Sequence, residues 1–303
     1  MTLRATLVVL AAAALAVGAA AASTRPVPAD LTGHFPEPAR VAVLVLENRS
    51  YDEVIGSTDA RYLNALARRY ALATRYYAIG HPSLPNYVAL LGGSTFDVRG
   101  DCNVCDIEAR SLVAQLDAAH ISWKAYFEDL TSSARPGVRT RLYDPHYNPF
   151  VYYESVRDTS FGRSRVVDFD ELRDDLRRGR LPRFSWIAPG VLHDGHDGSL
   201  READRYASVL VPRVLRALGP RGVLYLTWDE GARTDLSGVD GELGGGHVAL
   251  IAAGGMAARG AVTAVEANHY ALLRTIEAGF DLPALGRAAS PGTPVLSGLL
   301  RNG

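Results

Sequence analysis

Four short runs of mostly apolar residues stand out along the chain, and each begins or ends beside a cluster of polar side chains. They are Val41–Leu46, Phe184–Ala188, Val223–Trp228 and Val248–Ala253. Runs of this length that do not alternate with polar residues are typical of strands buried on both faces of a parallel sheet. The pattern therefore predicts a central sheet that is covered on both sides.

Segments in which apolar residues recur with helical spacing lie between these runs. They cover residues 60–70, 87–91, 111–119, 171–178, 203–218 and 269–279. The alternation of strands and helices indicates an α/β fold, a three-layer α/β/α sandwich with a mostly parallel central sheet. Because the 303 residues contain no internal repeat, we expect a single domain of this kind over residues 40–303.

The first residues have the features of an export signal. Arg4 precedes an apolar, alanine-rich run that ends in an A-x-A pattern at Ala22. Such a run is too short and too rich in alanine for a membrane span. We predict a signal peptide over residues 1–22 and a proline-rich lead-in over residues 23–39, and therefore a secreted, periplasmic or cell-envelope protein. A retained N-terminal anchor is the alternative.

Composition narrows the range of partners. The formal net charge is −1, and the basic residues form no block along the chain. This argues against nucleic acid or an anionic membrane surface as the main partner. No apolar run after the signal approaches the length of about 18 residues that a membrane span needs, so we expect no stable membrane insertion after cleavage. The sequence does not indicate an oligomeric state.

The chain has two cysteines, Cys102 and Cys105. In an exported protein a C-x-x-C pair more often closes a small disulfide than serves as a redox dithiol. Two cysteines alone also cannot complete a structural zinc site. We therefore predict a structural disulfide between them.

Acidic residues follow two of the predicted strands directly. The first strand ends at Glu47-Asn48, and the third is followed by Asp229-Glu230. Ligands of open α/β sheets bind beyond the carboxyl ends of the strands, and carboxylate and amide oxygens suit a hard divalent cation. Adjacent carboxylates also repel each other unless a cation or a proton neutralises them. The two pairs together predict a metal site, and ordinary loop polarity is the alternative for each pair alone.

The segment "HPSLPNYVALLGG", residues 81–93, contains a candidate nucleophile. Pro85 suits the first turn of a helix, which places Ser83 at or beside the helix N-cap. Serine is favoured there for structural reasons alone. The same position would also put the hydroxyl beside free N–H groups that attract phosphate, where a metal could lower its pKa. Position alone leaves both interpretations open.

Two further loops carry candidate site residues. The sequence "HDGHDG", residues 193–198, follows the second strand, and Asp194 and His196 are the preferred pair within it. His247 follows three glycines, which would let the backbone approach a ligand closely. The loop closed by the predicted disulfide could also direct the amide of Asn103 toward a phosphoryl oxygen of a substrate.

Several of these segments together resemble a known family. The matching blocks include "VLVLENRSYDEVIG", "HPSLPNYVALLGG", "YDPHYNPFVYY", "FSWIAPGVLHDGHDGS", "LYLTWDEG" and "GGGHVALIAAGG". Their order resembles that of the phosphoesterase family of secreted acid phosphatases and phosphocholine-type phospholipases C. This family is similar to the alkaline-phosphatase-like superfamily, which implies an α/β/α sandwich with metal at the strand ends.

The resemblance also implies a role for individual residues. The implied metal ligands are Glu47, Asn48, Ser83, Asp229 and Glu230. The implied catalytic residues are Ser83, His196 and His247, and the implied substrate contacts are His81 and Asp194. The cofactor is then a divalent ion: oxygen ligands favour Ca²⁺, Mg²⁺ or Mn²⁺, and participation of histidine would admit Zn²⁺ or iron. The chain departs from the pattern at "GARTD", residues 231–235, where more glycine is expected.

The functional hypothesis is a secreted, metal-dependent acid phosphatase that hydrolyses small phosphomonoesters through a phosphorylated Ser83. One alternative is a phospholipase C, in which the tyrosines of "LYDPHYNPFVYY" would form an aromatic wall for choline, although a structural role for that loop is favoured. The small size of the chain favours the phosphatase. A second alternative is a secreted protein that binds metal or phosphate without turnover.

Overall fold

The computed structural model describes residues 35–130 and 137–301. The predicted signal peptide, residues 1–22, and most of the lead-in, residues 23–39, lie outside these ranges, so both stay predictions. Within the described ranges, no helix combines the length and the apolar character needed to cross a membrane.

A nine-stranded sheet runs through the centre of the domain, with the strand order β4-β3-β5-β1-β6-β7-β2-β8 and β9 paired with β2. The strands are β1 (Arg40–Leu46), β2 (Ala71–Tyr77), β3 (Trp123–Phe127), β4 (Val166–Asp168), β5 (Phe184–Ala188), β6 (Gly222–Trp228), β7 (His247–Gly254), β8 (Val262–Thr263) and β9 (Ala267–Asn268).

All strands of this sheet run in one direction except β7, which is antiparallel to both of its neighbours, β2 and β6. The predicted mostly parallel sheet is thereby confirmed. The reversal of β7 has a consequence for the site, because it brings the start of β7 to the edge where the other strands end. His247, the first residue of β7, pairs with Tyr77 at the end of β2.

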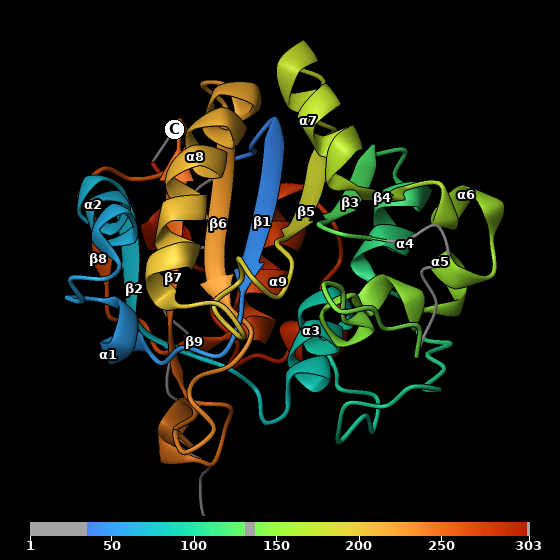
Figure 1. The fold of residues 1–303 in the computed structure, drawn as a ribbon, viewed down its shortest axis with the longest axis horizontal. Helices are drawn as coiled ribbons and strands as arrows, with labels where there is room; N and C mark the ends of the chain where they lie inside the picture. Colours follow the sequence, from blue (N-terminus) through green and yellow to red (C-terminus); the bar gives the residue numbers. More distant parts are fainter. Residues whose placement is uncertain (1–34, 131–136, 302–303) are drawn as a thin grey trace, which may run out of the picture. The chain divides into compact units, whose positions relative to one another are not determined.

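Two layers of helices cover the sheet. The helices are α1 (Tyr51–Val54), α2 (Arg61–Arg69), α3 (Ser83–Gly92), α4 (Leu112–Ala118), α5 (Glu154–Arg157), α6 (Ser160–Arg163), α7 (Phe169–Arg178), α8 (Leu200–Leu218) and α9 (His269–Gly279). Figure 1 shows α7 and α8 in front of the sheet and α3, α4 and α9 behind it. Helix α8 packs on α2 and α7, and α3 packs on α4 and α9, so the α/β/α sandwich is confirmed.

The four apolar runs form the interior of this sandwich. Val41–Leu46 and Val223–Trp228 are almost completely buried, as a strand covered on both faces requires. Strand β5 and helix α9 have the bounds that their patterns predict. Strands β2 and β3 were not predicted, because each mixes charged and apolar residues within a short segment, "ALATRYY" and "WKAYF".

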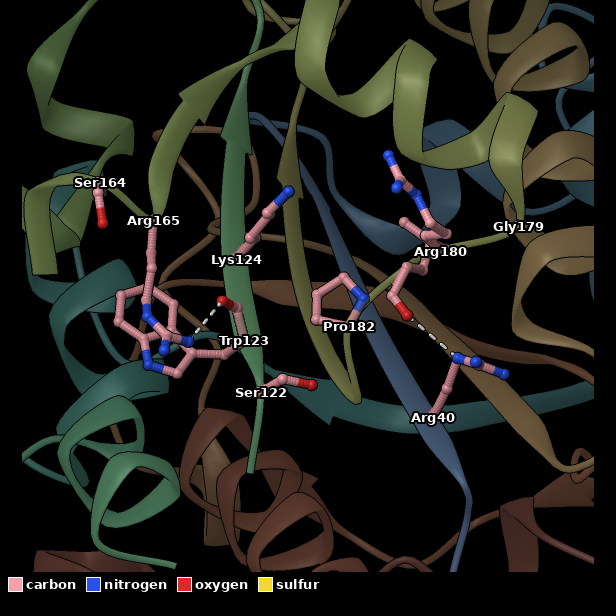
Figure 2. A pocket seen from close by; sticks show the side chains of 10 residues that line it. Arg40, Ser122, Trp123, Lys124, Ser164, Arg165, Gly179, Arg180 and Pro182 are labelled. Carbon is pink, nitrogen blue, oxygen red and sulfur yellow. Dashed lines mark hydrogen bonds between the residues drawn. The ribbon is translucent and has the colours of Figure 1, made fainter. Parts of the chain in front are cut away.

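The two edges of the sheet differ in the side chains they carry. At the amino edge, a pocket of about 640 Å³ is lined mainly by basic and polar residues, among them Arg40, Lys124 and Arg165 (Figure 2). Several of these groups already have partners: Lys124 forms ion pairs with acidic residues of α7, and Arg165 lies over the ring of Trp123. The acidic residues that follow β1 and β6, and His247 at the start of β7, lie at the opposite, carboxyl edge.

Candidate active site

The two acidic pairs meet at the ends of neighbouring strands. Strands β1 and β6 are paired in register up to Leu46 and Trp228, so the residues that follow them lie side by side. The main-chain N–H of Asp229 donates to the carbonyl of Leu46 at 3.0 Å, and that of Asn48 donates to Oδ1 of Asp229 at 3.1 Å. Asn48 has a φ of 53°, a left-handed conformation that asparagine tolerates better than most residues. The predicted convergence of these two pairs is therefore observed.

Burial of these carboxylates makes their charged form costly. Glu47 accepts a hydrogen bond from the hydroxyl of Tyr87 at 2.8 Å, and its main-chain N–H donates to the carbonyl of Asp194 at 2.9 Å. Burial, followed by the charges of Asp229 and Asp194, raises the pKa of Glu47 well above its usual value. Burial, followed by the charge of Glu230, does the same for the pKa of Asp229. A cation at this place would relieve both costs.

Asp194 belongs to the same group of buried acids. Its side chain is 1% exposed, and burial raises its pKa to about 7. Oδ1 accepts the main-chain N–H of His196 at 2.8 Å, whereas Oδ2 has no hydrogen-bond partner within the described ranges. A carboxylate so placed suits a cation better than a phosphate oxygen, because two anions repel each other. The predicted contact of Asp194 with substrate stays untested.

Ser83 is the first residue of α3 and follows Pro82 at the N-cap. Its hydroxyl is nearly buried and donates to Oδ1 of Asn48 at 3.4 Å. The proximity of the same hydroxyl lowers the pKa of Asp229, against the larger effect of burial. Asn86 fixes the preceding turn, because its Oδ1 accepts the N–H of Ile79 at 2.8 Å and its Nδ2 donates to the carbonyl of Gly80 at 2.7 Å. The helix begins at Ser83, two residues before the start expected from Pro85.

Both ring nitrogens of His81 have protein partners, and the predicted contact of His81 with substrate stays untested. Its Nδ1 lies 2.9 Å from Oε2 of Glu230, and its Nε2 lies 2.9 Å from the carbonyl of Asp235. The hydrogen bond to Glu230 is the main reason why the pKa of His81 is raised. An imidazolium that donates from both nitrogens fits this arrangement, so His81 orients Glu230. Its predicted contact with a phosphate is not visible in these bonds.

His196 and His247 differ in their distance from the acids. His196 is half-exposed and bonded to Asp197, yet its charge lowers the pKa values of both Asp194 and Glu230, which places it at the rim of the site. The ring of His247 is stacked on Tyr51 with centroids 4.4 Å apart, and its Nε2 lies 2.9 Å from the carbonyl of Thr74. These contacts hold the ring of His247 at the end of the sheet, and they do not connect it with the carboxylates.

The glycines before His247 serve packing between chain segments. A Cβ on Gly245 would lie 2.4 Å from the carbonyl of Gly80, so only glycine fits this approach. The loop "GARTD" contributes here too, because Asp235 accepts the hydroxyl of Ser50 at 2.9 Å and the N–H of His247 at 3.0 Å. The carbonyl of Asp235 also contacts the ring of His81. Asp235 therefore links the start of α1, His81 and β7, a role that its position in the sequence does not reveal.

The loop that contains Asn103 approaches the start of α3, and the predicted contact of Asn103 with substrate stays untested. Cys102 and Cys105 form the predicted disulfide, but Asn103 between them is exposed. It is Asp101 that reaches the site, because its Oδ1 accepts the main-chain N–H of Leu84 at 3.1 Å, one residue after Ser83. Sequence reasoning missed Asp101, although its place directly before the disulfide-closed loop was a usable signal.

A fourth histidine, His269, contacts the backbone of Asp229. His269 is completely buried, with Nδ1 2.8 Å from the hydroxyl of Tyr76 and Nε2 2.5 Å from the carbonyl of Asp229. Burial lowers the pKa of His269 to about 4, so the ring is neutral and donates one proton. The ring fixes the backbone of Asp229. The sequence predicted only that His269 begins a helix, and it did not indicate this contact.

The tyrosines of the long connection are structural. Tyr143, Tyr147, Tyr152 and Tyr153 are all at most 1% exposed. Tyr153 donates its hydroxyl to the carbonyl of Val88 in α3 at 3.0 Å, and Phe150 packs between Trp123 and Trp186. The favoured structural interpretation of this loop agrees with this burial, and an open aromatic wall for choline does not.

The set of donor atoms is compatible with a hard cation, because it includes oxygen ligands other than carboxylates. In the described ranges, no three His, Cys, Asp or Glu side chains are clustered closely enough to hold an ion by themselves. The predicted set adds the amide of Asn48 and the hydroxyl of Ser83. Oδ2 of Asp229 is buried there without a hydrogen-bond partner, an expensive state that a bound cation would satisfy.

Comparisons with known proteins identify relatives of this chain. The family model described as Phosphoesterase family matches residues 57–283. A phosphate-repressible acid phosphatase of Penicillium chrysogenum is 32% identical over 236 residues, which are 74% of this chain and 55% of that protein. A phosphatidylinositol-3-phosphatase of Mycobacterium tuberculosis is 28% identical over 258 residues, 84% of this chain and 81% of that protein. The chain spans little more than half the length of the fungal acid phosphatases it matches.

Solved structures with the same fold are more distant in sequence. A protein of the alkaline phosphatase superfamily from Vibrio parahaemolyticus matches with a TM-score of 0.59 at 11% identity, over 86% of this chain and 70% of that one. A phosphonate monoester hydrolase from Silicibacter pomeroyi matches with a TM-score of 0.56 at 11% identity, over 86% of this chain and 76% of that one. These matches establish an alkaline-phosphatase-like fold.

Proposed function

The chain belongs to the Phosphoesterase family, and on this premise we propose that it is an exported, metal-dependent phosphoric ester hydrolase with Ser83 as its nucleophile. The acid phosphatases among its relatives make phosphomonoesters the first substrate class to test. The observation that carries the proposal is the position of the Ser83 hydroxyl, at the start of α3 and 3.4 Å from Oδ1 of Asn48.

The residues that would hold a divalent ion are Glu47, Asn48, Ser83, Asp229 and Glu230, with Asp194 as a further carboxylate beside Glu47. When bound, the ion would lower the pKa of the serine hydroxyl and offset negative charge on the transferring phosphoryl group. The side chains of the protein prepare this place: Tyr87 orients Glu47, His81 orients Glu230, and His269 fixes the backbone of Asp229.

The reaction follows from the position of Ser83. The hydroxyl of Ser83 gives up its proton to solvent and its oxygen attacks phosphorus; the bond from phosphorus to the leaving oxygen breaks, and the leaving oxygen takes up a proton. Water then attacks the phosphoserine, releasing phosphate and restoring the hydroxyl of Ser83. His196, at the rim of the site with a half-exposed ring, is the histidine best placed to exchange that proton with solvent.

Replacing the nucleophile tests the proposal. Ser83→Ala should lower kcat for p-nitrophenyl phosphate by at least about 10²-fold while bound metal stays measurable. Ser94→Ala, a substitution of a serine that follows the C-cap of α3, is the matched control and should leave kcat unchanged. Near-normal turnover by Ser83→Ala would exclude the Ser83 role, and a metal-loaded wild-type protein inert toward a panel of phosphoesters would favour a binding protein without turnover.

A phosphodiesterase of the phospholipase C type is the second candidate. The burial of Tyr143, Tyr147, Tyr152 and Tyr153 removes the choline wall that favoured it. Hydrolysis of p-nitrophenyl phosphorylcholine faster than p-nitrophenyl phosphate would nevertheless reverse the order of the two proposals.

A further inference from the structure

The carboxylate of Asp101 accepts a hydrogen bond from the N–H of Leu84, a donor that could otherwise bind a phosphoryl oxygen of the substrate. Oδ1 of Asp101 accepts the N–H of Leu84 at 3.1 Å, and Leu84 directly follows Ser83. Free N–H groups in the first turn of a helix bind phosphate oxygens, and helix α3 has ten residues, long enough for this effect. A phosphoryl group on Ser83 would therefore lie beside an N–H that already donates to the carboxylate of Asp101.

Other polar groups around Asp101 are buried and lack partners. The hydroxyl of Tyr152 is fully buried and has no hydrogen-bond partner within the described ranges, and neither has Nε2 of His146. The pKa of Tyr152 is raised first by burial and then by neighbouring charges that include Asp144 and Asp101, which places its hydroxyl near these acids. Buried polar atoms without partners are rare in folded proteins, and an ordered water or ion beside them is the usual explanation.

The charges that face Asp101 are mostly negative. His146 is the nearest basic group, with Nδ1 4.0 Å from Oδ2 of Asp101, but the same nitrogen lies 3.1 Å from Oδ1 of Asp144. Arg139 also pairs with Asp144. The pKa of Glu230 is raised mainly by burial, and the charge of Asp101 adds to this.

We propose that Asp101 selects substrates by charge: it favours phosphoryl groups with a single negative charge over dianionic ones. This inference rests on the proposed function. A dianionic monoester would place two negative charges beside the carboxylate of Asp101. A phosphodiester or a singly protonated monoester would place one negative charge there. The side chain of Asp101 is 34% exposed. Two like charges about 4 Å apart repel by about 1 kcal/mol even in water, which is enough to change affinity severalfold. Asp101 is thus a specificity residue beside the nucleophile.

The substitution Asp101→Asn removes the charge and keeps an oxygen that can accept the N–H of Leu84. Asp97→Asn is the matched control, because Asp97 lies on the same loop, is almost fully exposed, and has a φ of 59° that asparagine tolerates. We would measure kcat/KM at pH 8 for p-nitrophenyl phosphate, which is then a dianion, and for bis(p-nitrophenyl) phosphate, a monoanion. Asp101→Asn should raise the ratio of the first to the second by at least about tenfold, and Asp97→Asn should not change it.

If Asp101→Asn changes kcat/KM equally for both substrates, Asp101 only supports α3. If neither value changes, the charge of Asp101 does not affect either substrate. Either result overturns the inference and leaves the proposed hydrolase function unaffected. If the metal-loaded wild type hydrolyses neither substrate, the proposed function fails. Calorimetry with inorganic phosphate at pH 8 then tests the selector alone: Asp101→Asn should bind phosphate at least about tenfold more tightly than the wild type, and equal affinities would overturn it.

Discussion

The main-chain N–H of Asn48 donates a hydrogen bond to Oδ1 of Asp229 at 3.1 Å, which joins two residues 181 positions apart. It closes the carboxyl ends of β1 and β6 against each other. The same carboxylate keeps its second oxygen, Oδ2, buried and without a partner within the described ranges. The side chain of Asn48 in turn accepts the hydroxyl of Ser83. One strand end therefore positions both a candidate ligand and the candidate nucleophile.

Asp229→Asn should abolish bound metal and activity, because it removes a charge from a group of buried acids and leaves the shape of the side chain intact. Without metal, the same variant should unfold at a higher temperature than the wild type in EDTA, since burial and Glu230 oppose ionisation of Asp229. Elemental analysis and thermal unfolding measure these two effects. Stoichiometric metal in the variant would remove Asp229 from the ligand set.

Tyr87→Phe tests the support of Glu47. The buried Tyr87 hydroxyl donates to Oε1 of Glu47 at 2.8 Å, and phenylalanine fills the same space without this donor. Loss of a partner that orients a metal ligand typically weakens metal affinity about 10–100-fold, which calorimetric titration of the metal-free protein would detect.

Tyr153→Phe is the matched control, because it also removes one buried hydroxyl bond, to the carbonyl of Val88. Both variants should lose about 0.5–1.5 kcal/mol of stability. Equal metal affinities in the two variants would show that Tyr87 has a structural role only.

Glu277→Gln tests a buried acid in α9 that is far from the predicted ligands in the chain. Glu277 is completely buried, its Oε1 accepts the N–H of Leu285 at 3.0 Å, and burial raises its pKa from 4.5 to about 8. The neutral acid therefore stabilises the fold fully below pH 4.5, and this contribution is lost as the pH rises through about 8. The uncharged glutamine should avoid this loss.

Thermal unfolding of the metal-free proteins at pH 5 and pH 8 measures the difference. Glu277→Gln should gain about 1–3 kcal/mol relative to the wild type between the two pH values, a shift of several degrees at pH 8. The exposed substitution Glu108→Gln should give no such gain. A wild type whose stability relative to Glu277→Gln is the same at both pH values would contradict the raised pKa.

Strands with mostly apolar residues and a helix with regular helical spacing were predictable from the sequence. β5 and α9 have their predicted bounds, and β1, β6 and β7 differ by one residue at an end or by one at each end. β2 and β3 escaped prediction because the sheet stabilises them from outside: β3 pairs with β5 through five residues although Lys124 interrupts its apolar pattern. For such strands, the neighbouring strand supplies the information that the local sequence lacks.

The candidate site divides in the same way. Residues that directly follow a strong strand, Glu47, Asn48, Asp229 and Glu230, could be placed at one edge from the sequence, because parallel strands end together. Asp235 and His269 could not, since each acts through a main-chain group of another segment. Asp101 also acts on a main-chain group, the N–H of Leu84, and its place before the disulfide-closed loop was its only signal. The direction of β7 was equally hidden, because an apolar run reads the same in both orientations.

By itself the sequence determined the layered α/β architecture, the disulfide and the two acidic strand ends, since these depend on local patterns and on residue chemistry. Only the tertiary structure decided which side chains meet: His247 is held by tyrosines, His81 by Glu230, and the N–H beside Ser83 by Asp101. The physical reason is that hydrogen bonds and charge repulsion act over a few ångströms, and only the packed sheet brings residues so far apart in the chain within that distance.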